Sequence, residues 1–275
     1  MTAVSPFRVA LVQMVSTPKV AENLDAAAKL VAEAAAQGAK LVALPEYFCI
    51  LGMRDTDKVA AKEKDGAGPI QEFLAATAKR HGVWLVGGSV PLESADPGKV
   101  RNSCLIYDLA GRRVARYDKI HLFGLELGAE RFDEGRTIEA GDTPCAIDSP
   151  FGRMAVSVCY DVRFPELYRA LAPMDIILVP SAFTATTGRA HWETLLRARA
   201  IENLAWVLAP AQGGTHPNGR QTHGHTMAVD PWGKVVAERA TGAGVVLADV
   251  DPGFQARMRA SLPALAHRVL PGRRS

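Results

Sequence analysis

The sequence lacks any apolar stretch of about 18 residues, the length that a membrane-spanning helix needs. It also lacks a basic segment followed by a long apolar one near its start, so we expect neither a secretory signal nor a membrane partner. Cysteine is scarce, with 4 in 275 residues and no tight spacing among them, which does not fit a disulfide framework. Together these absences predict a cytoplasmic protein.

An excess of one charge is missing as well, because 32 basic residues stand against 29 acidic ones and the net charge is only +3. A balance this close does not predict a nucleic acid as partner. The basic residues near the C-terminus, His267, Arg268, Arg273 and Arg274, are interpreted as a solvated tail. The hydrophobic fraction of 48% supplies enough apolar material for one large core.

Short apolar runs alternate along the chain with segments of helical periodicity. The segment 19–37 places Leu24, Ala28, Val31 and Ala35 on one helix face, and Gly38 follows it. Strands are expected at 7–12, 41–44, 83–86, 154–158, 176–179, 205–208 and 244–250, and further helices at 69–81, 165–172 and 191–203. This alternation predicts βαβ units around buried strands.

Two antiparallel hairpins interrupt this alternation. The first joins 104–107 to 114–117 and the second joins 226–229 to 235–237, each through a turn with Asp and Gly. The segments 124–141 and 181–189 are interpreted as long loops, which in compact domains are often functional.

Three reactive side chains follow predicted strands directly. Glu46 comes after 41–45, Lys119 after 114–118, and Cys159 after 154–158. The carboxyl ends of strands are where open α/β sheets bind ligands, so these side chains are candidates for a common site.

Cys159 lies between a strand and a helix start, as a nucleophile on a tight turn does, where helix amides would lower the thiol pKa and help hold an oxyanion. A buried core cysteine is the alternative. Cys49, Cys104 and Cys145 lack this setting and are assigned to packing.

Glu46 has apolar neighbours on both sides, and a desolvated carboxylate suits proton transfer from a thiol and to a leaving amine. Lys119 is also flanked by apolar residues, and if it is buried it needs a counter-charge, which Glu46 and the Cys159 thiolate could supply. The alternatives are an exposed loop glutamate and a lysine whose ammonium reaches solvent.

These segments resemble the nitrilase superfamily of carbon–nitrogen hydrolases. The motifs are LPE at 44–46, YDKIHL at 117–122 and CYDVRFPE at 159–166. The stretches APAQGGTH at 209–216 and GHTMAVDPWG at 224–233 are similar to Nit-type amidases, and among them to the deaminated glutathione amidase branch.

The resemblance implies an α/β fold, a four-layer αββα sandwich. It implies one carbon–nitrogen hydrolase domain over residues 1–275, with a C-terminal tail from about 251. It also implies a catalytic triad, in which Glu46 is the general base, Lys119 the cation and Cys159 the nucleophile. The family often adds a second glutamate after the lysine motif, here Glu134, to orient the lysine or the attacking water. Three further glutamates of the same loop keep this last assignment open: Glu126, Glu130 and Glu139.

The mechanism expected from these roles needs no metal and no cofactor. Glu46 takes the Cys159 proton, and the thiolate attacks the carbonyl carbon of a small-molecule amide. Lys119 and the backbone amide of Tyr160 hold the oxyanion, and water then cleaves the thioester.

The substrate is expected to carry a carboxylate, because the fork of Arg163 suits two oxygens. An arginine bonded to backbone carbonyls is the alternative. Phe183, Thr186 and Thr187 are further candidates for lining the substrate pocket, although each could serve the loop alone. Deaminated glutathione is the expected substrate, and the alternative is an ω-amidase acting on α-ketoglutaramate.

Three rival interpretations of the function remain open from the sequence alone. A Cys–His hydrolase would use His121 or His191 as base, and a metal site would use His216, His223 and His225. A catalytically silent scaffold on the same fold is a third possibility. Relatives also imply a homodimer or higher homo-oligomer, for which 163–172 and 191–203 are the candidate elements.

Overall fold

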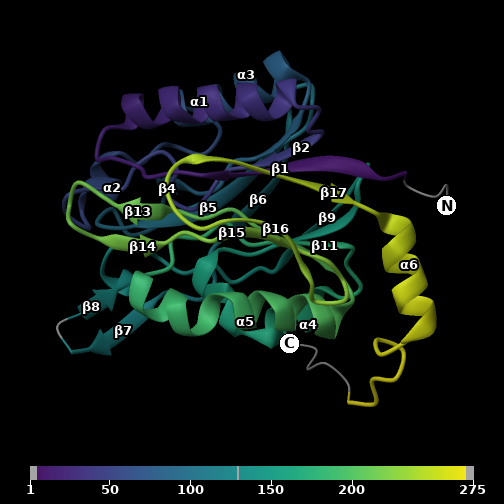
Figure 1. Cartoon of the computed structure of the whole chain (residues 1–275). Coiled ribbons are helices and arrows are strands. Elements are labelled where there is room, and N and C mark those ends of the chain that lie inside the picture. The colour runs from purple at the N-terminus through teal and green to yellow at the C-terminus, as the bar shows by residue number, and fades with distance from the viewer. Residues whose placement is uncertain (1–4, 129, 271–275) are drawn as a thin grey trace.

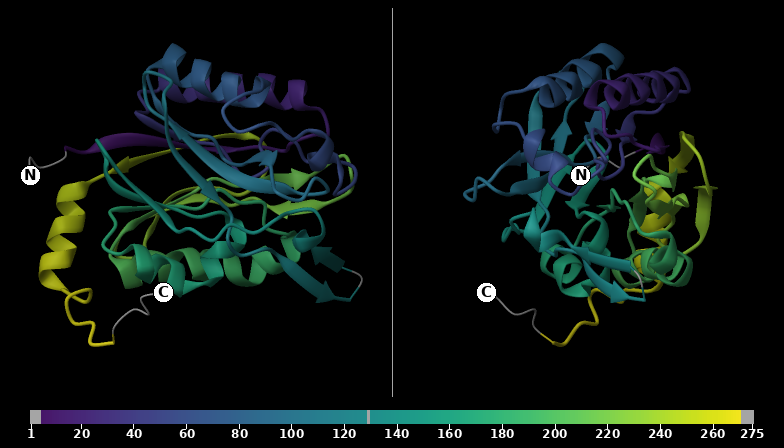
Figure 2. Two further views of the ribbon diagram at one scale, coloured as in Figure 1. Left: turned by 180° about the vertical axis from the view of Figure 1, so that it is seen from behind. Right: turned by 90° about the vertical axis from the view of Figure 1, so that its left-hand side faces the viewer.

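The computed structural model describes residues 5–128 and 130–270. Two sheets stack face to face, and helices cover the outer face of each (Figure 1). The same layers are visible from behind and from one end of the molecule (Figure 2). The predicted α/β class and four-layer αββα sandwich are therefore confirmed. None of the described helices is long and apolar enough to cross a membrane.

The first sheet contains three parallel strands beside antiparallel ones. Its strands are β1 (Phe7–Gln13), β2 (Leu41–Ala43), β3 (Trp84–Val86), β4 (Val90–Glu93), β5 (Val100–Tyr107), β6 (Arg113–Asp118) and β17 (Gly244–Val250). The order is β17-β1-β2-β3-β5-β4, with β6 paired to β5. β2 runs parallel to β1 and β3, and β6 runs in the same direction because two antiparallel pairings separate it from β3.

The second sheet has the order β16-β15-β12-β11-β10-β9. Its strands are β9 (Cys145–Ser149), β10 (Gly152–Val156), β11 (Ile176–Leu178), β12 (Trp206–Ala209), β15 (Thr226–Val229) and β16 (Val235–Arg239). β10, β11 and β12 are parallel. The two predicted hairpins are confirmed as β5–β6 and β15–β16.

The molecule has two hydrophobic cores, because successive side chains of a strand point to opposite faces of its sheet and both faces are covered. In β1, Val9 and Leu11 belong to the core that extends between the sheets, whereas Ala10 and Val12 belong to the core beneath α1 (Val20–Ala36) and α3 (Pro69–His81). Strands that are covered on both sides are apolar throughout, which is why they appear in the sequence as unbroken hydrophobic runs.

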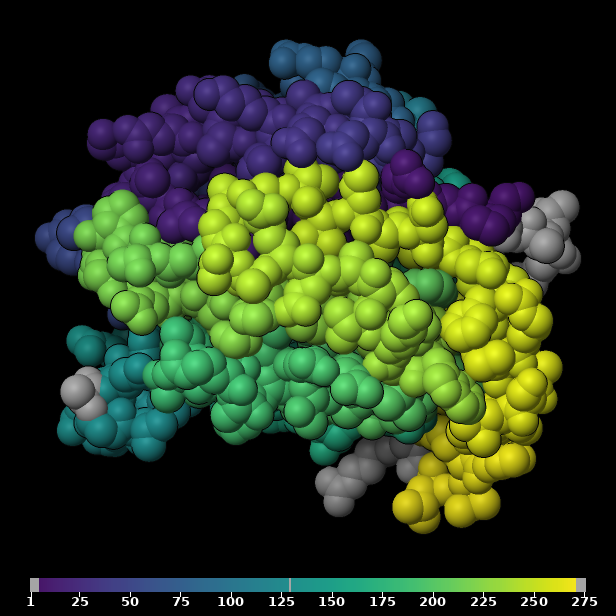
Figure 3. Space-filling view, viewed as in Figure 1, coloured from purple at the N-terminus to yellow at the C-terminus, as the bar shows by residue number. Residues whose placement is uncertain are grey.

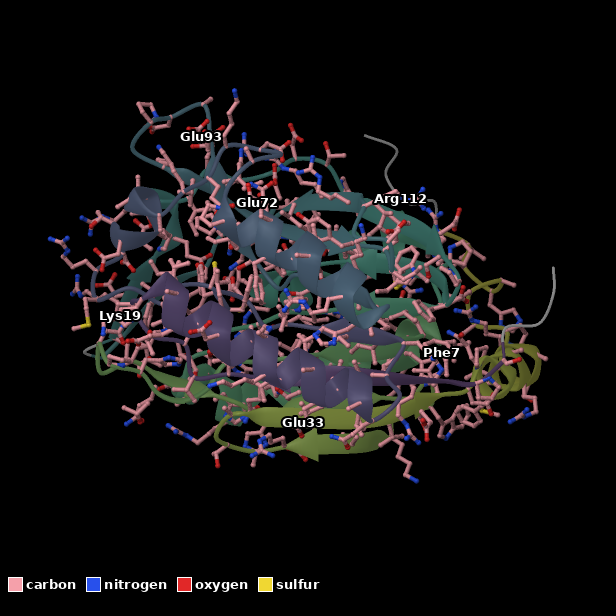
Figure 4. All side chains as sticks on the ribbon, turned by 90° about the horizontal axis from the view of Figure 1, so that it is seen from above. Phe7, Lys19, Glu33, Glu72, Glu93 and Arg112 are labelled. Carbon is pink, nitrogen blue, oxygen red and sulfur yellow. The ribbon has the colours of Figure 1, made fainter. Side chains whose placement is uncertain are left out.

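The helix face predicted for the first long helix is displaced by about one residue. The fully buried positions of α1 are Asn23, Ala27, Val31 and Ala34, while the predicted Leu24, Ala28 and Ala35 lie at the edge of the contact. Asn23 is buried because its side chain hydrogen-bonds the backbone at residues 17 and 49. Apolar periodicity alone could not find such a polar core residue. The opposite faces carry exposed charges, such as Glu33 on α1 and Glu72 on α3 (Figure 4).

Both segments expected as long loops contain regular structure, so that prediction was wrong. The segment 124–141 holds the hairpin of β7 (Gly124–Leu127) and β8 (Glu130–Asp133), followed by the 3-10 turn Glu134–Arg136. Helix α5 (Ala185–Asn203) begins six residues before the expected position, because the Thr184 side chain accepts a hydrogen bond from the Thr187 amide and caps it.

Helix α4 (Pro165–Leu171) lies beside α5 in the helical layer of the second sheet (Figure 1). The remaining elements are α2 (Asp57–Ala60), α6 (Pro252–Ser261), the hairpin of β13 (Gly213–Thr215) and β14 (Gln221–His223), and the 3-10 turn Cys159–Arg163. The expected C-terminal tail thus begins with a helix, which lies along one edge of the molecule (Figure 3). Gln255 of α6 donates to backbone oxygens of Asp175 and Leu204, which fastens the helix to the second sheet.

A single buried carboxylate joins the two sheets near the ends of β6 and β10. Asp161 is fully buried, and its Oδ2 accepts hydrogen bonds from the Tyr117 hydroxyl at 2.7 Å and the Val158 amide at 2.8 Å. Its Oδ1 accepts from the His121 amide at 3.0 Å and lies 2.7 Å from His121 Nδ1. The segment that carries Lys119 is therefore fixed against the turn that carries Cys159.

Replacing this carboxylate should destabilise the protein. Asp161→Asn turns an NH₂ group toward hydrogen-bond donors, so we expect the free energy of unfolding to fall by about 2–4 kcal/mol. Urea unfolding followed by circular dichroism measures it. Asp148→Asn is the control, because Asp148 is an exposed carboxylate on β9 and its loss should change the free energy by no more than about 0.5 kcal/mol. Equal effects of the two variants would contradict the joining role of Asp161.

Candidate active site

Glu46 is a buried carboxylate that accepts three hydrogen bonds. It follows β2 and is 1% exposed. Its Oε1 accepts from Lys119 Nζ at 2.9 Å and from Asn102 Nδ2 at 3.0 Å, and its Oε2 accepts from the Ala182 amide at 2.9 Å. Since Ala182 follows β11 of the second sheet, this carboxylate is held from both sheets at once.

Lys119 is the completely buried cation of the site. It follows β6, at the same sheet edge as Glu46, and its Nζ lies 2.8 Å and 3.1 Å from the two oxygens of Glu134. Burial alone would lower the pKa of this ammonium, but the negative charges around it raise the pKa above its ordinary value. Lys119 therefore stays protonated at neutral pH.

Glu134 is the partner that completes the environment of this lysine. Besides Lys119, it accepts from the Tyr47 hydroxyl at 2.8 Å and the Phe123 amide at 2.7 Å. Burial raises the pKa of Glu134, but the Lys119 charge and these hydrogen bonds lower it more, so the net shift is downward. Of the four glutamates that the sequence left open in this loop, Glu134 is the one in contact with Lys119.

Cys159 opens the 3-10 turn that follows the β10 strand after Ser157 and Val158, and it is 7% exposed. Its φ of +51° lies in the left-handed region, which is uncommon for a residue with a Cβ and stores roughly 1–3 kcal/mol of strain. Burial and the nearby Glu46 carboxylate raise the pKa of the thiol, against the lowering effect of Lys119. The turn agrees with the sequence prediction, but the expected lowering of the thiol pKa is wrong: the resting sulfur is a thiol, and it needs a base before it can attack.

Glu46, Glu134 and Cys159 share one narrow cavity, and Lys119 contacts the two carboxylates without lining it. Its walls come from the ends of strands of both sheets and from the start of α5. They contain Glu46, Phe123, Glu134, Cys159, Tyr160, Arg163, Ala182, Phe183, Thr184, Thr187 and Arg220. A nucleophile, a carboxylate that can accept its proton and a fixed cation are the groups that acyl transfer through a thioester requires.

Arg163 lies in the wall of this cavity with an unsatisfied donor. Its guanidinium lies over the rings of Tyr160 and Phe183, at 5.5 Å and 5.3 Å from their centroids. Its Nη1 is 3.2 Å from Nδ1 of His191, whereas its buried Nε has no hydrogen-bond partner among the described residues. The cavity thus offers a positively charged donor near Cys159.

The other predicted pocket residues divide between two places. Tyr160, Phe183 and Thr187 line the Cys159 cavity. Thr186 does not line it; it faces the neighbouring cleft and donates to Glu130 Oε1 at 2.6 Å. Thr186 and Thr187 are successive residues of helix α5, so their side chains point in different directions. The prediction of a loop for this segment could not show that difference.

Several residues of the site were missed by the sequence analysis. Asn102 holds Glu46, Tyr47 holds Glu134, and Thr184 and Arg220 line the cavity. A signal existed only for Asn102. It stands with Arg101 and Ser103 near the start of a strand that is otherwise apolar or aromatic, and such polar groups are buried only with partners.

The histidines of the rival interpretations lie outside the lining of the Cys159 cavity in the described residues. His121 and His191 are bonded to Asp161 and Arg163, and neither is among the described residues that line the Cys159 cavity. Both ring nitrogens of His216 are hydrogen-bonded, to Ser16 O and Thr222 Oγ1. Within residues 5–128 and 130–270, no three or more His, Cys, Asp or Glu side chains form a group that could hold a metal ion.

Comparison with known proteins agrees with this geometry. The family described as "Carbon-nitrogen hydrolase" matches residues 8–260. A deaminated glutathione amidase of Synechocystis sp. is 41% identical over 270 residues, covering 96% of this chain and 98% of the relative. The omega-amidase NIT2 of Xenopus tropicalis is 37% identical and covers 95% of each chain.

A solved structure supports the same assignment. Saccharomyces cerevisiae Nit3, a member of branch 10 of the nitrilase superfamily, superimposes with a TM-score of 0.88 at 30% identity and covers 98% of each chain. The resemblance stated from the motifs is thus confirmed, and this chain belongs to the carbon–nitrogen hydrolase family of the nitrilase superfamily, as an amidase of the Nit type.

Proposed function

We propose that this amidase cleaves a small carboxylate-bearing amide through a thioester on Cys159, with Glu46, Lys119 and Glu134 as the other catalytic groups. The observation that carries the proposal is the buried Lys119 ammonium, which pairs with the carboxylates of Glu46 and Glu134, because both carboxylates line the cavity that also contains the Cys159 thiol.

In the acylation half, Glu46 takes the proton from Cys159, and the sulfur forms a bond to the amide carbonyl carbon. The oxyanion is stabilised by Lys119 and by the backbone amide of Tyr160. The carbon–nitrogen bond then breaks, and Glu46 returns its proton to the leaving amine. The raised pKa of the Cys159 thiol is the reason that a base must act first.

In the deacylation half, Glu46 takes a proton from water, and the oxygen attacks the thioester carbonyl. Collapse of the second tetrahedral intermediate breaks the carbon–sulfur bond, and Glu46 returns the proton to sulfur. Glu134 keeps Lys119 charged and in position through both halves, since its own low pKa keeps it ionised.

The substrate we propose is deaminated glutathione, with α-ketoglutaramate as the alternative. The names of the two relatives described above support these two substrates. Both molecules carry a carboxylate on the acyl side of the amide, and we assign that carboxylate to Arg163, whose Nε has no partner among the described residues.

We further propose that residues 1–275 form a single catalytic domain, because strand ends of both sheets contribute to one cavity. All four cysteines are free thiols, which fits a reducing compartment such as the cytoplasm.

A homodimer across α4 and α5 is proposed as well. Ile201 of α5 and Trp232 of the β15–β16 turn are 46% and 57% exposed on that side, although both are large and apolar.

Loss of the nucleophile should abolish turnover. We expect Cys159→Ala to lower kcat by at least about 10⁴-fold, because no other described group in the cavity can form the thioester. Cys145→Ala is the matched control, since this cysteine is half-buried in β9 away from the cavity, and it should retain activity within about threefold. Amide hydrolysis and intact mass with a slow ester substrate measure both. An acyl adduct on Cys159→Ala would refute the assignment.

Removing the arginine should affect charged substrates more than neutral ones. Arg163→Met should lower kcat/KM for α-ketoglutaramate by about 100-fold. The loss of kcat/KM for 4-oxopentanamide, which has a methyl group in place of the carboxylate, should be at least about ten times smaller. Arg153→Met, in an exposed ion pair on β10, serves as the control for net charge. Equal losses on the two amides would exclude Arg163 as the carboxylate partner.

The proposed dimer predicts a mass of two chains in sedimentation at micromolar concentration. Ile201→Glu should shift the population toward monomer, because it introduces a charge into an apolar contact. Leu109→Glu should not, since Leu109 is equally exposed but lies in the β5–β6 turn next to α3. A monomer throughout the concentration range would reject the dimer.

A further inference from the structure

A second, larger cavity adjoins the Cys159 cavity and is not used by the mechanism above. It is a cleft of about 550 Å³, and it shares Thr184 and Arg220 with the narrow cavity. Its walls come from residues 47–58, 130–132, 184–189 and 218–221. The elements around it, α2, β7–β8 and β13–β14, gather at one end of the sandwich (Figure 1).

The side chains that line this cleft carry a net positive charge. Five of its lining side chains are cationic and two are carboxylates. Two of the cations, Arg54 and Arg131, form exposed ion pairs with carboxylates that do not line the cleft. Lys58 and Arg220 are different, because both are partly withdrawn from solvent. Among the described residues, Arg220 has no ion pair and Lys58 has only a long one, to Asp55.

Lys58 is 14% exposed, and its nearest carboxylate oxygen belongs to Asp55, at 3.8 Å. Its Nζ donates to Thr137 Oγ1 at 3.2 Å and lies 5.7 Å from the centroid of the Tyr47 ring. Burial lowers the pKa of this ammonium, so an anion beside it would be stabilised more strongly than at an exposed lysine.

Arg220 and Glu130 each leave a buried polar atom without a partner. Arg220 donates from Nη2 to Ala182 O at 2.9 Å and lies over the Phe132 ring, but its Nε has no partner among the described residues. Glu130 accepts from Thr186 through Oε1, while its buried Oε2 has none. Unsatisfied buried polar atoms are rare in native proteins. Here an acceptor and a donor of this kind belong to two residues that line the same cleft, which favours a site that a polar ligand completes.

We propose that this cleft binds the leaving-group side of the substrate, with Arg220 and Lys58 holding a carboxylate and Glu130 accepting an N–H. The inference rests on the proposed function, in which Arg163 takes the carboxylate of the acyl side. The leaving group that fits is a dipeptide-like amine with a terminal carboxylate, because it supplies both the anion and the peptide N–H. Ammonia would leave the cleft unused.

The two proposed substrates therefore differ in the part that this cleft would bind. Deaminated glutathione and α-ketoglutaramate present the same acyl group to Cys159, but only the former has a leaving amine with a carboxylate. The cleft predicts that the enzyme prefers the longer amide, and that the preference depends on that carboxylate.

The experiment compares deaminated glutathione with its C-terminal carboxamide, in which only the distal charge is removed. We expect wild-type kcat/KM to be about 30-fold higher for the acid, the range of one charged hydrogen-bonded contact. Arg220→Gln and Lys58→Gln should each reduce this ratio by about fivefold or more. The ratio within each variant cancels any general loss of activity. Arg153→Gln, with the same change of net charge, should keep the wild-type ratio.

The outcomes separate this inference from the proposed function. A wild-type ratio near one, or a ratio unchanged in both variants, would overturn the cleft assignment. Hydrolysis of α-ketoglutaramate without hydrolysis of deaminated glutathione would overturn it too, while the amidase proposal stands. Failure to hydrolyse either compound would overturn both.

Discussion

The active site is organised around the burial of one ammonium group. Lys119 is entirely removed from water, and an unpaired cation there would cost several kcal/mol, so its position depends on the carboxylates of Glu46 and Glu134. Those carboxylates are in turn held by Asn102, Tyr47 and backbone amides from separate elements. Satisfying one charge therefore requires the ends of β2 and β6, the turn after β8 and the segment after β11 to meet at one point.

The same requirement explains why the protein needs two sheets. Lys119 and Glu46 belong to the first sheet and Cys159 to the second, and the buried Asp161 carboxylate connects the two supporting segments. The nucleophile occupies a strained turn and carries a thiol whose pKa burial has raised. Such a thiol is unreactive at rest, and the neighbouring Glu46 carboxylate is the base that the proposed mechanism uses to make it a nucleophile.

Two adjoining cavities divide the tasks in the mechanism that we propose. The narrow cavity contains Glu46, Cys159 and the arginine that we assign to the acyl side, and the wide cleft is lined by further residues with unsatisfied polar atoms. Members of one family can share the reacting groups and differ in the leaving amine they accept, because the second cavity is built from α2, two surface hairpins and the start of α5. Such segments vary in sequence without disturbing the sheets.

Local patterns in the sequence determined most of the fold and the three reacting residues. Apolar runs and Asp/Gly turns predicted the central strands and both main hairpins. Glu46, Lys119 and Cys159 were recognisable because each follows a predicted strand. Only the tertiary structure decided which of four loop glutamates contacts Lys119, that Thr186 faces away from the nucleophile, and that Arg220 joins it. It also decided that Asn23 is a core residue and that the thiol pKa is raised. The physical reason is that strand and helix periodicity are properties of neighbouring residues, whereas charge pairing, burial and hydrogen bonding join side chains that are far apart in the chain.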